Sequence, residues 1–280
     1  GYQNGKMPDY DVPLAKLLKE NFKQKERSDM IDKIGVQLYT IRDTMKTAED
    51  IRESFRKLKA MGIDQGQTAG CAIPYEEFGK IAEEEQFEIV GTHDDFNLMV
   101  NDFPAALAAH RALHTNLMGI GGFHYENKQQ VEEFIKKANI VGEKAAENGC
   151  KFTYHHHSHE FMRFDDGDYA MHMLVEGLDP KTTSFVLDTY WLQHAGADVR
   201  QWISKLSGRI DILHLKDMGR GPEGPFITEV GNGNINFAGA LEEAEKAGVK
   251  YYVIEQDICP GDPFESLKQS VDYIQKNFMK

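Results

Sequence analysis

Residues 151–161 read KFTYHHHSHEF, a short β-like run followed by four histidines and a glutamate. Neutral imidazole and carboxylate together suit a divalent first-row metal such as Zn, Mn, Co or Fe. Side chains alternate between the faces of a strand, so His156 points away from His155 and His157, and the four rings cannot all meet one ion. The tract therefore indicates either a metal site that uses part of it or a solvated histidine-rich loop.

The surrounding chain repeats one pattern eight times: a short apolar run, a polar loop and a stretch of helical periodicity. Eight such units in about 250 residues, without a linker, predict a (β/α)8 TIM barrel. The alternative, a doubly wound sheet, would lack its usual GxGxxG motif after the first strand. The predicted strands are 34–40, 64–68, 87–93, 117–121, 151–157, 183–188, 210–215 and 251–256, and the predicted helices are 48–61, 75–85, 103–115, 128–148, 169–177, 198–206, 236–247 and 263–278.

The barrel is expected to be a single domain over residues 31–280. Residues 1–30 read as a polar N-terminal arm, with at most one amphipathic helix around Pro13–Lys23. The sequence begins with Gly1 rather than Met, so it does not reveal whether a leader preceded it. A cytoplasmic and a periplasmic location therefore both stay open.

The charge and composition argue against two classes of partner. The net charge is −13, from 32 Lys and Arg against 45 Asp and Glu. Proteins that bind nucleic acid normally present a basic face, so no nucleic-acid partner is expected. No run approaches the roughly 18 apolar residues of a membrane span, so no membrane association is expected either.

Polar side chains collect at the carboxyl ends of the predicted strands. In (β/α)8 barrels the loops that follow these ends converge on one mouth, where the chemistry takes place. Strand 3 ends at His93, strand 5 in the histidine tract, and strand 6 at Asp188; strands 7 and 8 end with His214 and Glu255. We therefore expect these groups to lie together at the mouth of the barrel.

Over residues 34–278 the chain resembles the sugar phosphate isomerase/epimerase superfamily, the xylose isomerase-like barrels. The motifs that carry this resemblance are specific in combination. They are Gly35-Val-Gln-Leu-Tyr39, Tyr154-His-His-His-Ser-His-Glu-Phe161, Leu187-Asp-Thr-Tyr-Trp191, Gly208-Arg209, His214-Leu-Lys-Asp217, Gly231-Asn-Gly-Asn234 and Val253-Ile-Glu-Gln-Asp257.

The resemblance implies one divalent metal ion as cofactor, with manganese favoured over zinc, cobalt and magnesium. In the superfamily the ion is held by Glu, Asp, His and Glu from strands 5, 6, 7 and 8. The corresponding residues of this sequence are Glu160, Asp188, His214 and Glu255.

The strand-5 ligand has more than one candidate. Relatives that read Tyr-His-Asn-His, two variable residues and Glu-Phe point to Glu160, whereas other epimerases carry a glutamate at the strand tip, which is nearer His155 here. His155 and His157 therefore stay open as the ligand or as a catalytic group. His156 replaces the usual asparagine.

The resemblance also implies roles in catalysis and substrate binding. The catalytic candidates are Glu160, Glu255, His155 and Lys216, and the candidates for substrate binding are His93, His157, Trp191 and Asp217. Structural alternatives stay open for several of them. Asp188 could cap the turn that follows it, Lys216 and Asp217 could form a bracing ion pair, and Trp191 could be a packing residue.

Together these residues predict a metal-dependent isomerase or epimerase that acts on a keto-sugar or sugar derivative through an enediolate. A metal that chelates a carbonyl and its neighbouring hydroxyl acidifies the adjacent C–H, and positioned acids and bases then move the proton. The same enolate can expel a β-substituent, so a lyase or dehydratase acting on 3-keto-glycosides is the alternative. An abasic-site endonuclease, which the charge disfavours, and a non-catalytic sugar-binding module are weaker alternatives. A small carbohydrate is the expected partner, and a homo-oligomer stays open.

Overall fold

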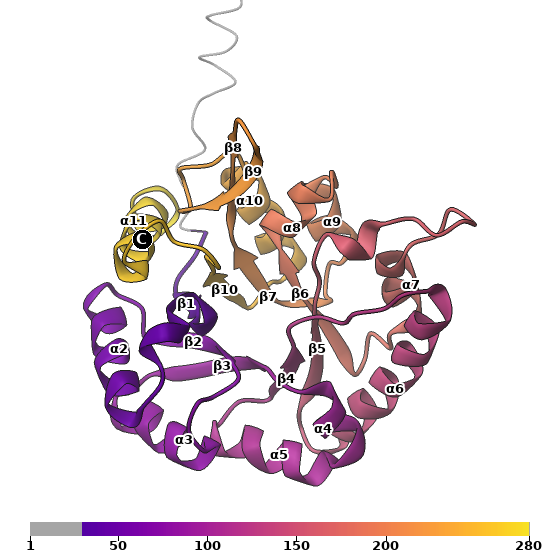
Figure 1. Cartoon of the computed structure of the whole chain (residues 1–280), viewed down its shortest axis with the longest axis horizontal. Helices are drawn as coiled ribbons and strands as arrows, with labels where there is room; N and C mark the ends of the chain where they lie inside the picture. The colour runs from indigo at the N-terminus through magenta and orange to yellow at the C-terminus, as the bar shows by residue number, and fades with distance from the viewer. Residues whose placement is uncertain (1–29, 280) are drawn as a thin grey trace, which may run out of the picture.

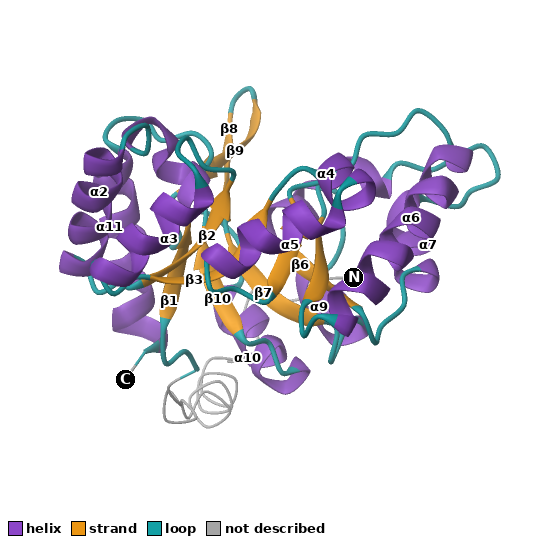
Figure 2. Cartoon of the chain, turned by 90° about the horizontal axis from the view of Figure 1, so that it is seen from below, coloured by secondary structure: helices purple, strands orange, loops and turns teal. Residues whose placement is uncertain are grey.

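The computed structural model describes residues 30–279, in which eight parallel strands form one sheet surrounded by helices. Figure 1 shows the helices as an outer ring around the strands, and Figure 2 shows the strands in the centre from a second direction. The strands are β1 (Ile34–Gln37), β2 (Gln65–Ala69), β3 (Glu88–His93), β4 (Leu117–Ile120), β5 (Lys151–His155), β6 (Thr183–Asp188), β7 (Ile210–Leu215) and β10 (Tyr251–Ile254). The predicted barrel is confirmed, and the predicted arm helix at Pro13–Lys23 lies outside the described residues.

The sheet runs in the order β3-β2-β1-β10-β7-β6-β5-β4, and β3 and β4 meet to bring its two edges together. At this seam the backbone N–H of Asp94 donates to the carbonyl of Gly119 over 2.8 Å. The N–H of Gly119 donates in turn to Oγ1 of Thr92 over 3.1 Å. These bonds nearly close the barrel although the regular ladder is interrupted there.

The helices of the outer ring bury one face against the strands, as their periodicity predicts. They are α2 (Ala48–Ala60), α3 (Tyr75–Glu84), α5 (Phe103–Ala112), α6 (Lys128–Glu147), α7 (Ala170–Gly177), α9 (Val199–Lys205), α10 (Phe237–Ala247) and α11 (Pro263–Phe278). Many begin at an Asp, Asn or Thr whose side chain accepts a backbone N–H, as Thr47 does from Asp50 in a capping box at α2. The helix at α10 ends at Gly248, whose φ of 74° suits a residue without Cβ.

Short elements follow several strands at the mouth, and the prediction that the first strand extends to residue 40 is wrong because residues 38–40 turn into one of them. They are η1 (Leu38–Thr44), α4 (Phe96–Asn101), η2 (His159–Phe161), α8 (Thr189–His194) and the antiparallel hairpin of β8 (Asp217–Gly221) and β9 (Gly224–Thr228). Each is too short for a hydrophobic period to show in the sequence. The hairpin stands out from the barrel beside α8 in Figure 1.

The strand register brings inward-facing side chains to one level at the mouth. Asp188 pairs with His214 across β6 and β7, and His214 pairs with Val253, two residues before Glu255. His155 pairs with Val186, two residues before Asp188. Because side chains two residues apart share a face of the sheet, all four of these residues point to the same side.

No helix within residues 30–279 is long and apolar enough to cross a membrane.

The tight seam between β3 and β4 gives a test of the fold. A Cβ added at Gly119 would lie 2.3 Å from the carbonyl oxygen of Thr92 and 2.3 Å from Oγ1 of Thr153. Gly119→Ala should therefore lower the free energy of unfolding by about 1–3 kcal/mol, measured by urea denaturation. Gly261→Ala is the control, since a Cβ there meets no atom within 4 Å and should change stability by less than about 0.5 kcal/mol. Equal stability of both variants would contradict this account of the seam.

Candidate metal centre and active site

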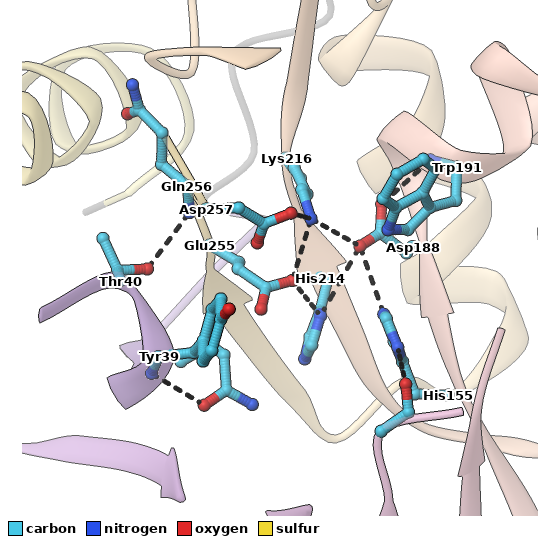
Figure 3. Close-up of polar contacts among 12 residues, drawn as sticks. Tyr39, Thr40, His155, Asp188, Trp191, His214, Lys216, Glu255, Gln256 and Asp257 are labelled. Carbon is cyan, nitrogen blue, oxygen red and sulfur yellow. Dashed lines mark hydrogen bonds and ion pairs between the residues drawn. The ribbon is translucent and has the colours of Figure 1, made fainter. Parts of the chain in front are cut away.

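Four side chains from neighbouring strands converge at the mouth of the barrel. His155 ends β5, Asp188 ends β6, His214 lies in β7 and Glu255 follows β10. One nitrogen or oxygen from each lies within 4.8 Å of those of the other three, and all four side chains are buried. Figure 3 shows them pointing toward one another, so they form a candidate site for one divalent metal ion.

Asp188 uses its two oxygens for different purposes. Its Oδ1 accepts the backbone N–H of Trp191 over 3.1 Å and caps α8. Its Oδ2 lies 3.3 Å from Nε2 of His155 and 3.6 Å from Nδ1 of His214. The expected capping role and the expected ligand role are therefore compatible in one carboxylate.

The donor set of these four residues fits a divalent cation. His155 Nδ1 lies 3.1 Å from the carbonyl oxygen of Gly121, which only accepts, so in the neutral ring Nδ1 carries the proton and Nε2 turns a lone pair toward Asp188. His214 Nδ1 likewise faces Oε2 of Glu255 at 3.0 Å. Lone pairs directed at carboxylates require a cation between them or an extra proton on the rings. Imidazole and carboxylate are ligands that Zn, Mn, Co and Fe share.

Lys216 is the ammonium group of the cluster. Its side chain is 1% exposed, and Nζ lies 2.7 Å from Oδ2 of Asp257, 3.3 Å from Oε2 of Glu255 and 3.9 Å from Oδ2 of Asp188. Burial opposes its charge, but these carboxylates outweigh burial and raise the pKa of Lys216. Burial would raise the pKa of Glu255, yet Lys216 and His214 hold it well below its usual range. Three carboxyl groups surround this one ammonium, and their negative charge favours the binding of a further cation at the cluster.

Above the cluster lies a cavity of about 360 Å³, within the range of small-ligand pockets. Its walls include Tyr39, His93, His157, Lys216 and Glu255. Burial lowers the pKa of His157 to about 2, with a further contribution from His155, and the pKa of His93 is lowered well below its usual value for similar reasons. Both rings are therefore neutral, and His93 Nε2 and His157 Nδ1 are buried without a hydrogen-bond partner in the described chain.

Glu160, expected as the strand-5 ligand, lies outside this cluster. Its Oε1 accepts the hydroxyl of Tyr154 over 2.8 Å and its Oε2 accepts the backbone N–H of His157 over 2.9 Å. It groups instead with His157 and His159. The side chain is fully buried and holds the turn after β5, while His155 occupies the corner of the cluster on that strand.

Two expected substrate-binding residues are placed beside the cavity rather than in its walls. Asp217 accepts backbone N–H groups of Gly231, Gly233 and Ile235 at 2.9 to 3.2 Å, which secures the loop after the β8–β9 hairpin. The anticipated ion pair of Lys216 with Asp217 is replaced by one with Asp257. Trp191 packs against His157 and lies 5.0 Å beneath the ammonium of Lys216, a cation–π contact.

Four residues of the site were absent from the sequence-based set. Asp257 pairs with Lys216, and His156 accepts the backbone N–H of Asp188 over 3.1 Å. Gln37 and Gln67 lie beneath His93 and His214 and contact both rings. Gln37, His156 and Asp257 lie within motifs that carry the resemblance, and Gln67 lies near the end of a predicted strand. Neither signal distinguishes a functional side chain from a packed one.

The position of the strand-5 ligand can be tested with two variants. His155→Ala should reduce zinc affinity by at least about 100-fold because it removes a ligand, whereas Glu160→Gln should change it by less than about tenfold. Glu160→Gln should instead lower the free energy of unfolding by about 1–3 kcal/mol, because one buried donor loses its acceptor. Competition titration with a chelator and urea denaturation measure the two effects. The opposite ranking of zinc affinities would return the ligand role to Glu160.

Metal affinity should rise with pH. Burial disfavours the charged ring of His214, but Glu255 and Asp188 outweigh burial and raise its pKa from 6.5 to about 9 in the metal-free protein. The charged ring therefore stabilises the metal-free fold fully below pH 6.5, and this stabilisation is lost as the pH rises through 9. A metal must displace this proton, so zinc affinity should increase up to about tenfold per pH unit from 6.5 to 9 and then level off. Calorimetric titrations in buffers of different ionisation enthalpy would reveal the released proton, and a flat profile would contradict this coupling.

Comparison with known proteins gives relatives among carbohydrate enzymes. The chain is 29% identical over 167 residues to an inosose dehydratase from Geobacillus thermodenitrificans, which covers 53% of this chain and 55% of that protein. An inosose dehydratase from Mesomycoplasma hyopneumoniae matches at 26% over 173 residues, which covers 54% of this chain and 56% of that protein. The chain thus spans about half the length of the curated relatives it matches.

A solved structure shows the same fold over nearly the whole barrel. It is a sugar phosphate isomerase/epimerase from Parabacteroides distasonis, with a TM-score of 0.77 at 21% identity, covering 89% of this chain and 96% of that chain. The IolI protein with a bound zinc atom has a TM-score of 0.67 at 14% identity, covering 89% of this chain and all of that chain. Residues 55–277 match the family described as xylose isomerase-like TIM barrel, and the chain belongs to this family.

Proposed function

We propose that the protein is a metal-dependent lyase that removes a β-substituent from a keto-sugar or keto-polyol. The observation that carries the proposal is the identity of the β5 group at the cluster. It is the imidazole of His155, so Glu255 is the one glutamate among the four candidate ligands. Epimerisation by paired glutamates needs a second one at the opposite face, whereas elimination needs one base and one acid.

His155, Asp188, His214 and Glu255 would hold the metal ion. Such an ion withdraws electron density from a substrate carbonyl and so acidifies the neighbouring C–H. Zinc and manganese both suit these ligands, and the zinc-bound IolI neighbour supports zinc beside the manganese that the resemblance favours.

Glu255 and Lys216 supply the proton transfers of the elimination. The carboxylate of Glu255 takes the proton from the carbon next to the carbonyl, and the electron pair forms a double bond to the β-carbon. The bond from the β-carbon to its oxygen breaks, and the Lys216 ammonium protonates the leaving oxygen. The proton on Glu255 then passes to Lys216 across 3.3 Å, which restores the starting charges.

An adjoining cavity suits a substrate larger than one ring. A second cavity of about 300 Å³ adjoins the first and shares Tyr39 and Ala69 as walls. It is lined by apolar Leu38 and Phe78 and by the cations Arg42 and Lys46. A leaving group bulkier than water could lie there, which favours a glycoside. The inosose dehydratase relatives support a keto-polyol that loses water, and both substrates share the same elimination.

Epimerisation is the second candidate, because His157 offers another neutral ring on the cavity wall, and its Nδ1 has no hydrogen-bond partner within residues 30–279. It lies beyond the end of β5, and β6 and β7 separate β5 from β10. A proton removed by Glu255 on one face could then be replaced on the other by a water proton passed through the neutral His157 ring, and the hydroxide left behind takes up the proton from Glu255. This route yields an epimer with solvent hydrogen at the α-carbon and no unsaturated ketone.

The proposed acid makes a specific kinetic prediction. Lys216→Gln should lower turnover of an alkyl 3-keto-glucoside by about 10²–10⁴-fold, because the alkoxide then leaves without a proton. With a 4-nitrophenyl 3-keto-glucoside the loss should be much smaller, since nitrophenolate leaves unaided. Both reactions would be followed by NMR in deuterated water with the zinc- or manganese-loaded protein.

Lys205→Gln, an exposed lysine on α9, is the control and should leave both rates unchanged. Equal losses for the two substrates would remove Lys216 from the acid role. A deuterated epimer without unsaturated ketone would favour the second candidate. Turnover with no deuterium at any carbon and no unsaturated product would reject both.

A further inference from the structure

Two buried glutamines lie directly beneath the cluster. Gln37 ends β1 and Gln67 lies in β2, and the two residues are register partners, so their side chains point the same way. Both are fully buried. Gln37 Nε2 donates to Gln67 Oε1 over 3.1 Å, which makes a continuous amide pair behind His93 and His214.

One backbone N–H fixes the orientation of the whole pair. One terminal atom of the Gln37 amide lies 3.2 Å from the backbone nitrogen of Tyr39. Because the Tyr39 N–H can only donate, this atom must be the acceptor, Oε1. Gln37 Nε2 therefore carries two protons toward the site. One is directed at Gln67, and the other at Nδ1 of His93, 3.3 Å away.

This orientation determines which ring nitrogen of each histidine is protonated. Gln67 must present Oε1 to Gln37, and the same oxygen lies 2.6 Å from Nε2 of His214, which must then carry a proton. In the neutral ring, from which a bound metal has displaced the second proton, His214 Nδ1 is left with a lone pair that faces Glu255. His93 Nδ1 accepts from Gln37, so its proton lies on Nε2, the buried atom without a partner in the described residues.

We propose that Gln37 and Gln67 are positioning residues that fix two tautomers: a lone pair on His214 Nδ1 for the metal and a donor on His93 Nε2 for a substrate oxygen. The part that concerns metal and substrate rests on the proposed function. Turning either amide around would set donor against donor or acceptor against acceptor at buried atoms, so the pair is held in one arrangement. The chain of bonds from Tyr39 thus connects η1 to the metal ligand in β7.

The test reads the tautomers directly, without any substrate. In the zinc-loaded wild-type protein, nitrogen-15 NMR of the histidine rings should place the proton on Nε2 of His93 and His214 and on Nδ1 of His155. In Gln37→Glu the second carboxylate oxygen has no proton to offer His93, so the ring proton should move to Nδ1. A proton on Nδ1 of His93 or His214 in the wild type would overturn the proposal, whether or not any variant folds.

A matched pair at Gln67 tests the link to the metal. Gln67→Met removes the acceptor for His214 and should weaken zinc binding by about 10–100-fold, the usual effect of losing a group that orients a ligand. Gln67→Glu keeps an oxygen toward both neighbours and should retain near wild-type affinity. Gln65→Met, a buried glutamine two residues earlier on the same strand, is the control and should bind zinc normally.

Wild-type zinc affinity in Gln67→Met, or equal losses in Gln67→Met and Gln65→Met, would overturn the role of Gln67. An unchanged His93 tautomer in folded Gln37→Glu would overturn the role of Gln37. These outcomes are separate from the proposed function, because a protein without lyase turnover still reports its tautomers and its zinc affinity.

Discussion

Two carboxylates buried at the mouth of the barrel are the constraint around which the other site residues are arranged. Asp188 is fully buried and Glu255 nearly so. An isolated charge in such a place is expensive, so each carboxylate requires cationic or N–H partners. Lys216 supplies one positive charge to both, and the two imidazoles turn nitrogens toward them. The second negative charge is balanced by the proton on His214 in the metal-free protein, and a divalent ion that displaces this proton would take over that role.

The parallel sheet delivers these groups without any contribution from long loops. Neighbouring strands end at one level, and alternate side chains of each strand point inward. Asp188 and His214 are register partners, and so are Gln37 and Gln67. Asp188 and His214 face the proposed ion, whereas Gln37 and Gln67 hydrogen-bond to the rings of His93 and His214. The site groups are therefore held by the strands of the barrel, which suits groups that must keep a fixed orientation.

The residues of the histidine-rich tract at the end of β5 have different structural roles. His155 points into the cluster, and His156 points across to β6, where it accepts the N–H of Asp188. The Glu160 carboxylate accepts hydrogen bonds from the hydroxyl of Tyr154 and from the backbone N–H of His157. The carboxylate stabilises the turn that places the two rings. The motif resembles a run of metal ligands, but only His155 is a candidate ligand of the main cluster. His156 and Glu160 hold the backbone around it through hydrogen bonds.

The sequence alone determined the eight-fold alternation of strands and helices, because hydrophobic periodicity is a local property. It also placed Asp188, His214 and Glu255 at strand ends, where the barrel geometry forces them together. It could not choose between His155 and Glu160, since the backbone turn of η2 decides which of them reaches the cluster. The partner of Lys216 and the roles of Gln37 and Gln67 were equally hidden. Each depends on atoms from another strand at hydrogen-bond distance, which the tertiary structure alone specifies.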